Sequence, residues 1–240
     1  MDPSATNRPA RALASLSPLA ALGSAALLAG CMTAKLDENR MTPMHIAKGE
    51  GVVILAKPQV EGTGAEQEFM SCVGGKLAHS SDRISVFGNE EFQNTMFPWF
   101  EPSVAPVRAE NVAALLDRPK VSRRLEETGV RYIVWLDGNT RKTDGGGSLA
   151  CAAAPGMAGC FGFGWWEKQS DYQATIWDLK SGKSAGSVST NVIGTSAILG
   201  VIVPLPFVAR VQGTACDRMA GQLRTFLKGG DPSVADSSAL

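Results

Sequence analysis

A charge-free apolar run near the amino terminus ends at a cysteine, and it decides which part of the chain is left to fold. Residues 13–28 contain no charged side chain and follow the basic residues Arg8 and Arg11. The run is as long as the core of a signal peptide but shorter than the roughly 20 residues that a membrane-spanning helix needs. Removing residues 1–30 leaves about 210 of the 240 residues, which is enough for one domain with its own core.

The run closes on Leu28, Ala29, Gly30 and Cys31, which resemble the lipobox of bacterial lipoproteins. The resemblance implies that the Cys31 sulfur receives a diacylglyceryl group, that cleavage follows before Cys31, and that the new amine is acylated. Two or more acyl chains give a stable membrane anchor. Because Met32 rather than an aspartate follows Cys31, the resemblance implies a lipoprotein of the outer membrane that faces the periplasm. The alternative is an uncleaved signal anchor.

The chain after residue 30 is nearly neutral, which excludes a strongly basic surface. The 23 basic residues lose Arg8 and Arg11, leaving 21, and the 23 acidic residues lose Asp2, leaving 22. Proteins that bind nucleic acid carry a clustered excess of positive charge. We therefore expect no nucleic-acid partner.

Of the five cysteines, four remain once Cys31 carries lipid. An even number in the oxidising periplasm predicts two disulfides, for which three connectivities exist. Cys151 and Cys160 close a short segment rich in glycine, so we expect them to pair locally and Cys72 to pair with Cys216. The alternatives are a metal site or a reactive thiol. Zinc sites bring closer cysteine spacing or histidines, so we expect neither a metal nor a cofactor.

Hydrophobic periodicity predicts an α+β domain with a single mixed sheet of about five strands packed against helices. The expected strands are residues 52–56, 84–87, 132–136, 172–179 and 184–190, and the expected helices are residues 66–80, 111–116, 121–127 and 214–227. Residues 31–50 are polar and are expected to form a lipidated tether. The domain is expected over residues 51–228, and residues 229–240 are expected to be a disordered tail.

The order of these elements, together with the turn sequence Asp-Leu-Lys-Ser-Gly-Lys at residues 178–183, distantly resembles two lipoprotein families. They are the curli secretion channel and the lipoprotein activators of penicillin-binding proteins. Both families act by binding other proteins or by assembling. The resemblance therefore implies a partner-binding or self-associating domain and brings no catalytic residue.

A long insertion at residues 139–170 departs from that pattern and predicts an extended hairpin. It carries the aromatic residues Phe161, Phe163, Trp165 and Trp166 beside the expected Cys151–Cys160 bridge. A braced loop with aromatic side chains can present a contact surface to a protein partner or to a membrane interface. The interpretation that we favour is that these rings fold back over the open face of the sheet and complete the core, and the exposed contact surface is the alternative.

Residues 192–209 form a second charge-free run. Gly194, Gly200, Pro204 and Pro206 interrupt it in ways that an isolated helix in lipid tolerates poorly. We expect a packed apolar loop between the last strand and the last helix. The alternative is a membrane hairpin or a subunit interface.

Catalysis is the less favoured reading of the sequence. His79 is the only histidine in the expected domain, and neither a Gly-x-Ser-x-Gly elbow nor a His-Glu-x-x-His helix occurs. A glycan-cleaving site would need carboxylates that meet in space, with Glu101, Asp137, Asp171 and Asp178 as the candidates. We expect a non-catalytic envelope lipoprotein; the alternatives are a subunit of an oligomeric secretion channel and a glycan-cleaving or glycan-binding protein.

Replacing the lipobox cysteine tests the anchor. Cys31→Ser should leave the precursor unprocessed and unlipidated, because no sulfur is present to accept the diacylglyceryl group. Labelled palmitate reports the modification. Continued labelling of the variant would contradict the predicted anchor.

Overall fold

A computed structural model describes residues 32–57, 65–80, 84–101, 104–106 and 108–230. The predicted signal peptide, Cys31 and the last ten residues of the predicted tail lie outside the described residues. Among the residues described, no helix has the length and apolarity required to cross a membrane.

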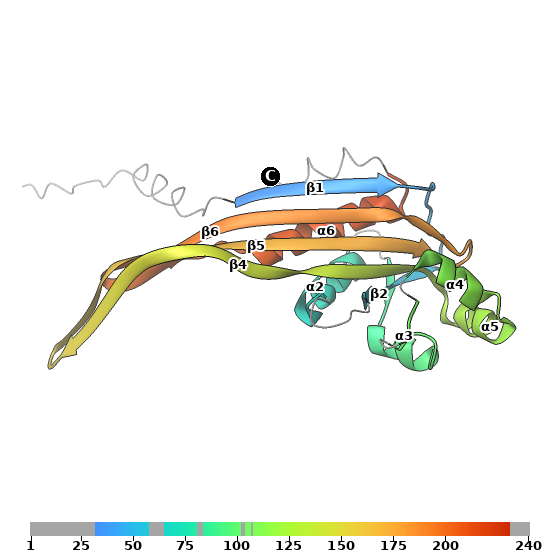
Figure 1. Ribbon diagram of the computed structural model, residues 1–240, viewed down its shortest axis with the longest axis horizontal. Helices are drawn as coiled ribbons and strands as arrows, with labels where there is room; N and C mark the ends of the chain where they lie inside the picture. Colours follow the sequence, from blue (N-terminus) through green and yellow to red (C-terminus); the bar gives the residue numbers. More distant parts are fainter. Residues whose placement is uncertain (1–31, 58–64, 81–83, 102–103, 107, 231–240) are drawn as a thin grey trace, which may run out of the picture.

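Six strands form one mixed sheet in the order β1-β6-β5-β4-β2-β3 (Figure 1). β2 pairs in parallel with β3 and β4, and the remaining neighbours are antiparallel. The α+β class and the mixed sheet are therefore confirmed, with more strands than expected. The strands are β1 (Met32–Arg40), β2 (Gly51–Ala56), β3 (Ser85–Phe87), β4 (Val130–Ala154), β5 (Met157–Asp178) and β6 (Lys183–Phe207).

The additional strand corrects the predicted tether. β1 pairs along its whole length with β6, from Met32 opposite Gly194 to Arg40 opposite Gly186. Its residues are exposed or half-buried, because β1 lies at the edge of the sheet. A polar sequence is typical of such an edge, and it does not distinguish an edge strand from a tether.

Helices cover both faces of the sheet and create two separate cores. On one face, α2 (Gln67–Ala78) and α6 (Val211–Leu227) pack on residues such as Val134 and Ile176. On the other face, Trp135 and Trp177 pack against residues of the segment that holds α3 (Asn89–Thr95), α4 (Ala109–Leu116) and α5 (Pro119–Thr128). Because successive side chains of a strand point to opposite faces of the sheet, β4 and β5 contribute residues to both cores.

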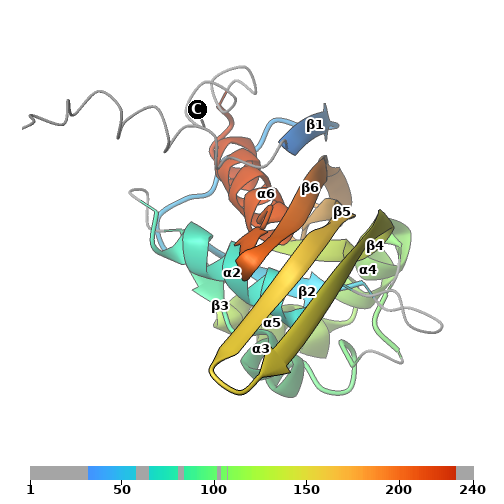
Figure 2. The same ribbon diagram turned by 90° about the vertical axis from the view of Figure 1, so that its left-hand side faces the viewer.

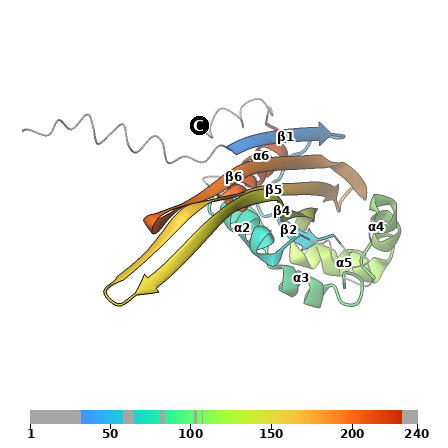
Figure 3. The same cartoon turned by 60° about the vertical axis from the view of Figure 1, so that its left-hand side comes forward.

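β4, β5 and β6 continue beyond both cores as a three-stranded extension that curves away from the body (Figures 1 and 3). We call the part beyond the level of Met32 the ribbon: residues 142–154, 157–168 and 194–202. The hairpin predicted at residues 139–170 is confirmed as the distal β4–β5 pair. The loop predicted at residues 192–209 is wrong, because β6 runs to Phe207 and pairs with β5 as far as Ile202.

Close backbone approach within the ribbon explains two of its glycines. Gly147 has φ of 106° and Gly162 has φ of 133°, a region that other residues rarely adopt. A Cβ at Gly147 would lie 2.2 Å from the Phe163 carbonyl oxygen, and one at Gly162 would lie 2.1 Å from the Ser148 carbonyl oxygen. These positions therefore require glycine for the two strands to stay paired.

Both predicted disulfides are present. Cys72–Cys216 joins α2 to α6 across a sequence separation of 144, and Cys151–Cys160 joins opposed residues of β4 and β5 across a separation of 9. The first bridge lies within the helical layer of the body. The second lies near the tip of the ribbon, away from both cores.

The two bridges should contribute differently to stability. Replacing Cys72 and Cys216 by serine should lower the free energy of unfolding by about 5 kcal/mol, because closing so long a loop removes much entropy from the unfolded chain. The matched control, with Cys151 and Cys160 replaced by serine, should leave the unfolding midpoint of the body nearly unchanged. Urea unfolding followed by tryptophan fluorescence compares them, and equal losses would contradict this expectation.

Candidate functional site

Apolar side chains gather on one face of the ribbon. Phe161, Phe163 and Trp165 alternate along β5 and so point to the same side. Leu199 lies opposite Phe163 on β6 and shares that side. Phe161 is 65% exposed, Phe163 46% and Leu199 40%. We call these four residues the aromatic face.

Trp166 lies on the opposite face of the ribbon, where it is paired with Gly145 on β4 and Ser196 on β6. A single surface holding all four predicted aromatic residues is therefore wrong, because strand geometry separates neighbours in sequence. None of the four rings belongs to either core cluster. The ribbon carries them away from the sheet that they were expected to cover.

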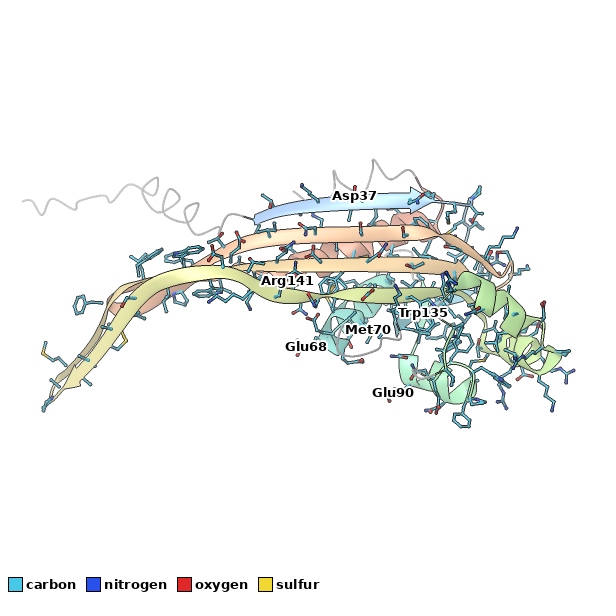
Figure 4. All side chains as sticks on the ribbon, in the orientation of Figure 1. Asp37, Glu68, Met70, Glu90, Trp135 and Arg141 are labelled. Atoms are coloured by element: carbon cyan, nitrogen blue, oxygen red, sulfur yellow. A yellow bond between two sulfur atoms is a disulfide. The ribbon has the colours of Figure 1, made fainter. Side chains whose placement is uncertain are left out.

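The charged residues of β4 and β5 stop within two positions of the base of the ribbon. At one level of the sheet, Met32 pairs with Gly194, Gly194 with Lys168, and Lys168 with Lys142. The charges near this level are carried by Arg141, Lys142, Asp144, Glu167 and Lys168, and Figure 4 labels Arg141 where the strands leave the body. Beyond it, residues 145–166 and 192–207 contain no charged side chain.

A polar cluster fixes the base of the ribbon to the helices. Glu66, directly before α2, accepts hydrogen bonds from the Thr140 amide at 3.0 Å, from the Tyr172 hydroxyl and from Gln212 Nε2 at 3.3 Å. The Thr140 hydroxyl lies 2.7 Å from that of the fully buried Ser170. One carboxylate thus connects β4, β5 and α6, which sets the direction in which the ribbon leaves the body.

Tyr172 supplies the aromatic part of this cluster. Its ring stacks on Phe69 of α2, with centroids 3.5 Å apart. Burial, followed by the hydrogen bond to Glu66, raises the pKa of Tyr172 to about 12. The phenol therefore stays protonated and remains a donor to Glu66 at neutral pH. Sequence reasoning missed the cluster, because its members are far apart in the chain and each suits an ordinary helix or strand position.

Carboxylates cap the outer edge of β4 at the base of the ribbon. The amides of Gly138, Thr140 and Gly145 donate to Asp137, Glu66 and Asp144 respectively. Among the described residues, no strand pairs with this edge beyond Leu136. Unpaired edges attract other strands, and these carboxylates occupy several donors that such pairing would use.

The carboxylates considered for glycan cleavage are only partly brought together. Asp137 and Asp171 line one open groove with Asp37, and Asp171 also contacts Arg141 at 3.1 Å and Asn191. Asp178 lies at the other end of β5, where it binds Arg131 at 2.8 Å and two amides of the β5–β6 turn. Glu101 lies in the segment after α3. The described residues contain no group of three or more His, Cys, Asp or Glu side chains placed to hold a metal.

Truncating the aromatic face should leave the fold intact. Phe161→Ala combined with Phe163→Ala should change the free energy of unfolding by less than about 0.5 kcal/mol per site, because both rings are largely exposed. The control Phe69→Ala removes a ring that is 1% exposed and should cost about 3–5 kcal/mol. A comparable loss in the double variant would place the two rings in a packed core.

Comparisons with known proteins identify no family for this chain. No family model matches it, and no curated protein matches its sequence. Solved structures with a similar course of the chain include the PelC dodecamer from Paraburkholderia phytofirmans and a point variant of it. Each is 10% identical, with TM-scores of 0.38 and 0.39 respectively. The matches cover 83% and 82% of this chain and 99% of each PelC chain.

Proposed function

We propose that this chain is a lipid-anchored protein of the bacterial outer membrane, facing the periplasm, and that it acts as a non-catalytic partner-binding or assembly module. The lipobox at Cys31 supports the anchor. The observation that carries the binding role is the aromatic face, because folding leaves it exposed while three long strands hold it in place.

Energetics favour a contact role for this face. Phe161, Phe163 and Leu199 keep large exposed apolar areas, and exposed apolar patches of this kind mark interaction surfaces. The polar cluster around Glu66 adds rigidity at the base of the ribbon. A surface that is already ordered loses less entropy on binding than a loop that must become ordered.

A second candidate is a subunit of an oligomeric envelope secretion channel. The observation that favours it is that, in the part of the chain that the structure describes, β1 on one side and distal β4 on the other have no strand paired to their outer edges. The two strands run in opposite directions, so copies placed side by side in the same orientation would bring antiparallel edges together. Because β1 begins at the level of Lys142 and carboxylates cap β4 near Thr140, neighbouring copies would have to be shifted along the strands for β1 to pair with β4 beyond Gly145.

Amine-reactive crosslinking in intact envelopes tests these candidates, since Lys142 and Lys168 stand exposed at the base of the ribbon. We expect discrete adducts that contain either one other protein or several copies of this chain. A ladder of copies supports the channel subunit, and a single foreign protein supports a partner-binding module.

A pair of variants ties the adducts to the aromatic face. Phe163→Asp should reduce the adducts several-fold, because a charge would have to be buried in the contact. The matched control is Gln173→Asp, an exposed position on the same side of β5. Recovery of monomer alone from the unaltered protein, or equal adducts from both variants, would contradict the proposed role.

A further inference from the structure

We infer that the aromatic face lies against the lipid bilayer that holds the chain's own Cys31 anchor. This inference rests on the anchor in the proposed function and names the bilayer as the surface that the aromatic face contacts; protein adducts then depend on Phe163 because the bilayer contact holds the ribbon in position. The strand that follows Cys31 begins at the level where the charges of β4 and β5 end, and β6 carries no charge beyond Lys183.

The pairing of the strands alone places the start of β1 beside the last charged residues of β4 and β5. Cys31 is joined by one peptide bond to Met32, which lies at the level of Lys168 and Lys142. β1 is antiparallel to β6, so the amino-terminal end of β1 points toward the tip of the ribbon. Acyl chains on Cys31 would therefore start at the base of the ribbon, on the side toward which the ribbon extends (Figure 1).

The dimensions of the ribbon suit a membrane. The part that is free of charge on all three strands runs on β6 from Ser196, opposite Trp166, to Ile202, the last β6 residue paired with β5. At about 3.3 Å per residue these six steps span roughly 20 Å, which fits within the roughly 30 Å of the hydrocarbon core. A protein partner would place no such limit on where charged residues stop.

The order of side chains along the ribbon follows the polarity of a bilayer surface. Arg141, Lys142 and Lys168 outnumber Asp144 and Glu167 at the base, and cations there can meet anionic headgroups. Trp165 and Trp166 come next on β5, and tryptophan concentrates at the membrane interface. Phe163 and Phe161 lie farther toward the tip, beyond the last charged residues of β5.

The outer edge of distal β4 limits how deeply a single copy can enter the bilayer. Backbone groups without partners are costly inside hydrocarbon, and among the described residues no strand pairs with distal β4 on its outer side. One copy therefore rests its aromatic face in the interfacial layer, to a depth of about 5–10 Å as interfacial segments do. Figure 2, viewed from the ribbon side, shows the helices of the body behind the three strands.

Site-specific photocrosslinking tests the contact directly. The lipidated protein carries p-benzoylphenylalanine at position 163 and is reconstituted in vesicles of phosphatidylethanolamine and phosphatidylglycerol. The matched control carries the same residue at position 173, which is exposed on the same side of β5 but lies within the body. Illumination should add the mass of a phospholipid at position 163, at least ten times more often than at position 173.

The outcomes separate this inference from the proposed function. Absence of lipid adducts at position 163, equal adducts at both positions, or adducts to a second copy in place of lipid would overturn the bilayer contact. The mass of the amino-terminal peptide independently reports acylation of Cys31, and its failure would overturn the proposed anchor. A bilayer contact that fails with Cys31 acylated leaves the anchor and the assembly role standing.

Discussion

The continuous hydrogen-bonded pairing of β4, β5 and β6 is the constraint on which the rest of the structure depends. The same three strands supply buried residues to both cores and then leave the body without interruption. Because β5 has a paired neighbour on each side from Cys160 to Asp178, the position of the ribbon follows from the packing of the body. The aromatic face is thus an extension of the folded core rather than an independent loop.

Local sequence patterns predicted the body well because each pattern reflects packing in the sheet or helices. In the apolar run at residues 52–56, the first four side chains are buried on both faces of the sheet, and the alternation after residue 172 matches a strand between two different environments. The pairing of Cys72 with Cys216 was also predicted, since Cys151 and Cys160 were close in sequence. These features require little knowledge of distant parts of the chain.

The parts that sequence reasoning missed depend on contacts between distant segments. β1 is polar because it lies at an edge, so its sequence contains no apolar alternation to detect. Residues 192–207 are uniformly apolar or small, and glycines and prolines hide their strand character. The cluster around Glu66 joins residues 74 and 146 positions away, at Thr140 and Gln212. The separation of Trp165 from Trp166 was predictable from strand alternation once the hairpin was expected.

The aromatic face can act as an ordered contact surface only if the ribbon is ordered before it meets any partner. Amide hydrogen exchange of the isolated protein measures this order most directly. The amides of residues 161–166 in β5 lie between two paired strands and should exchange at least a hundredfold more slowly than the same residues in an unstructured peptide. Exchange at the rate of an unstructured peptide, with β5 residues 172–178 still protected, would show that the aromatic face is not preformed and would contradict its role as an ordered contact surface.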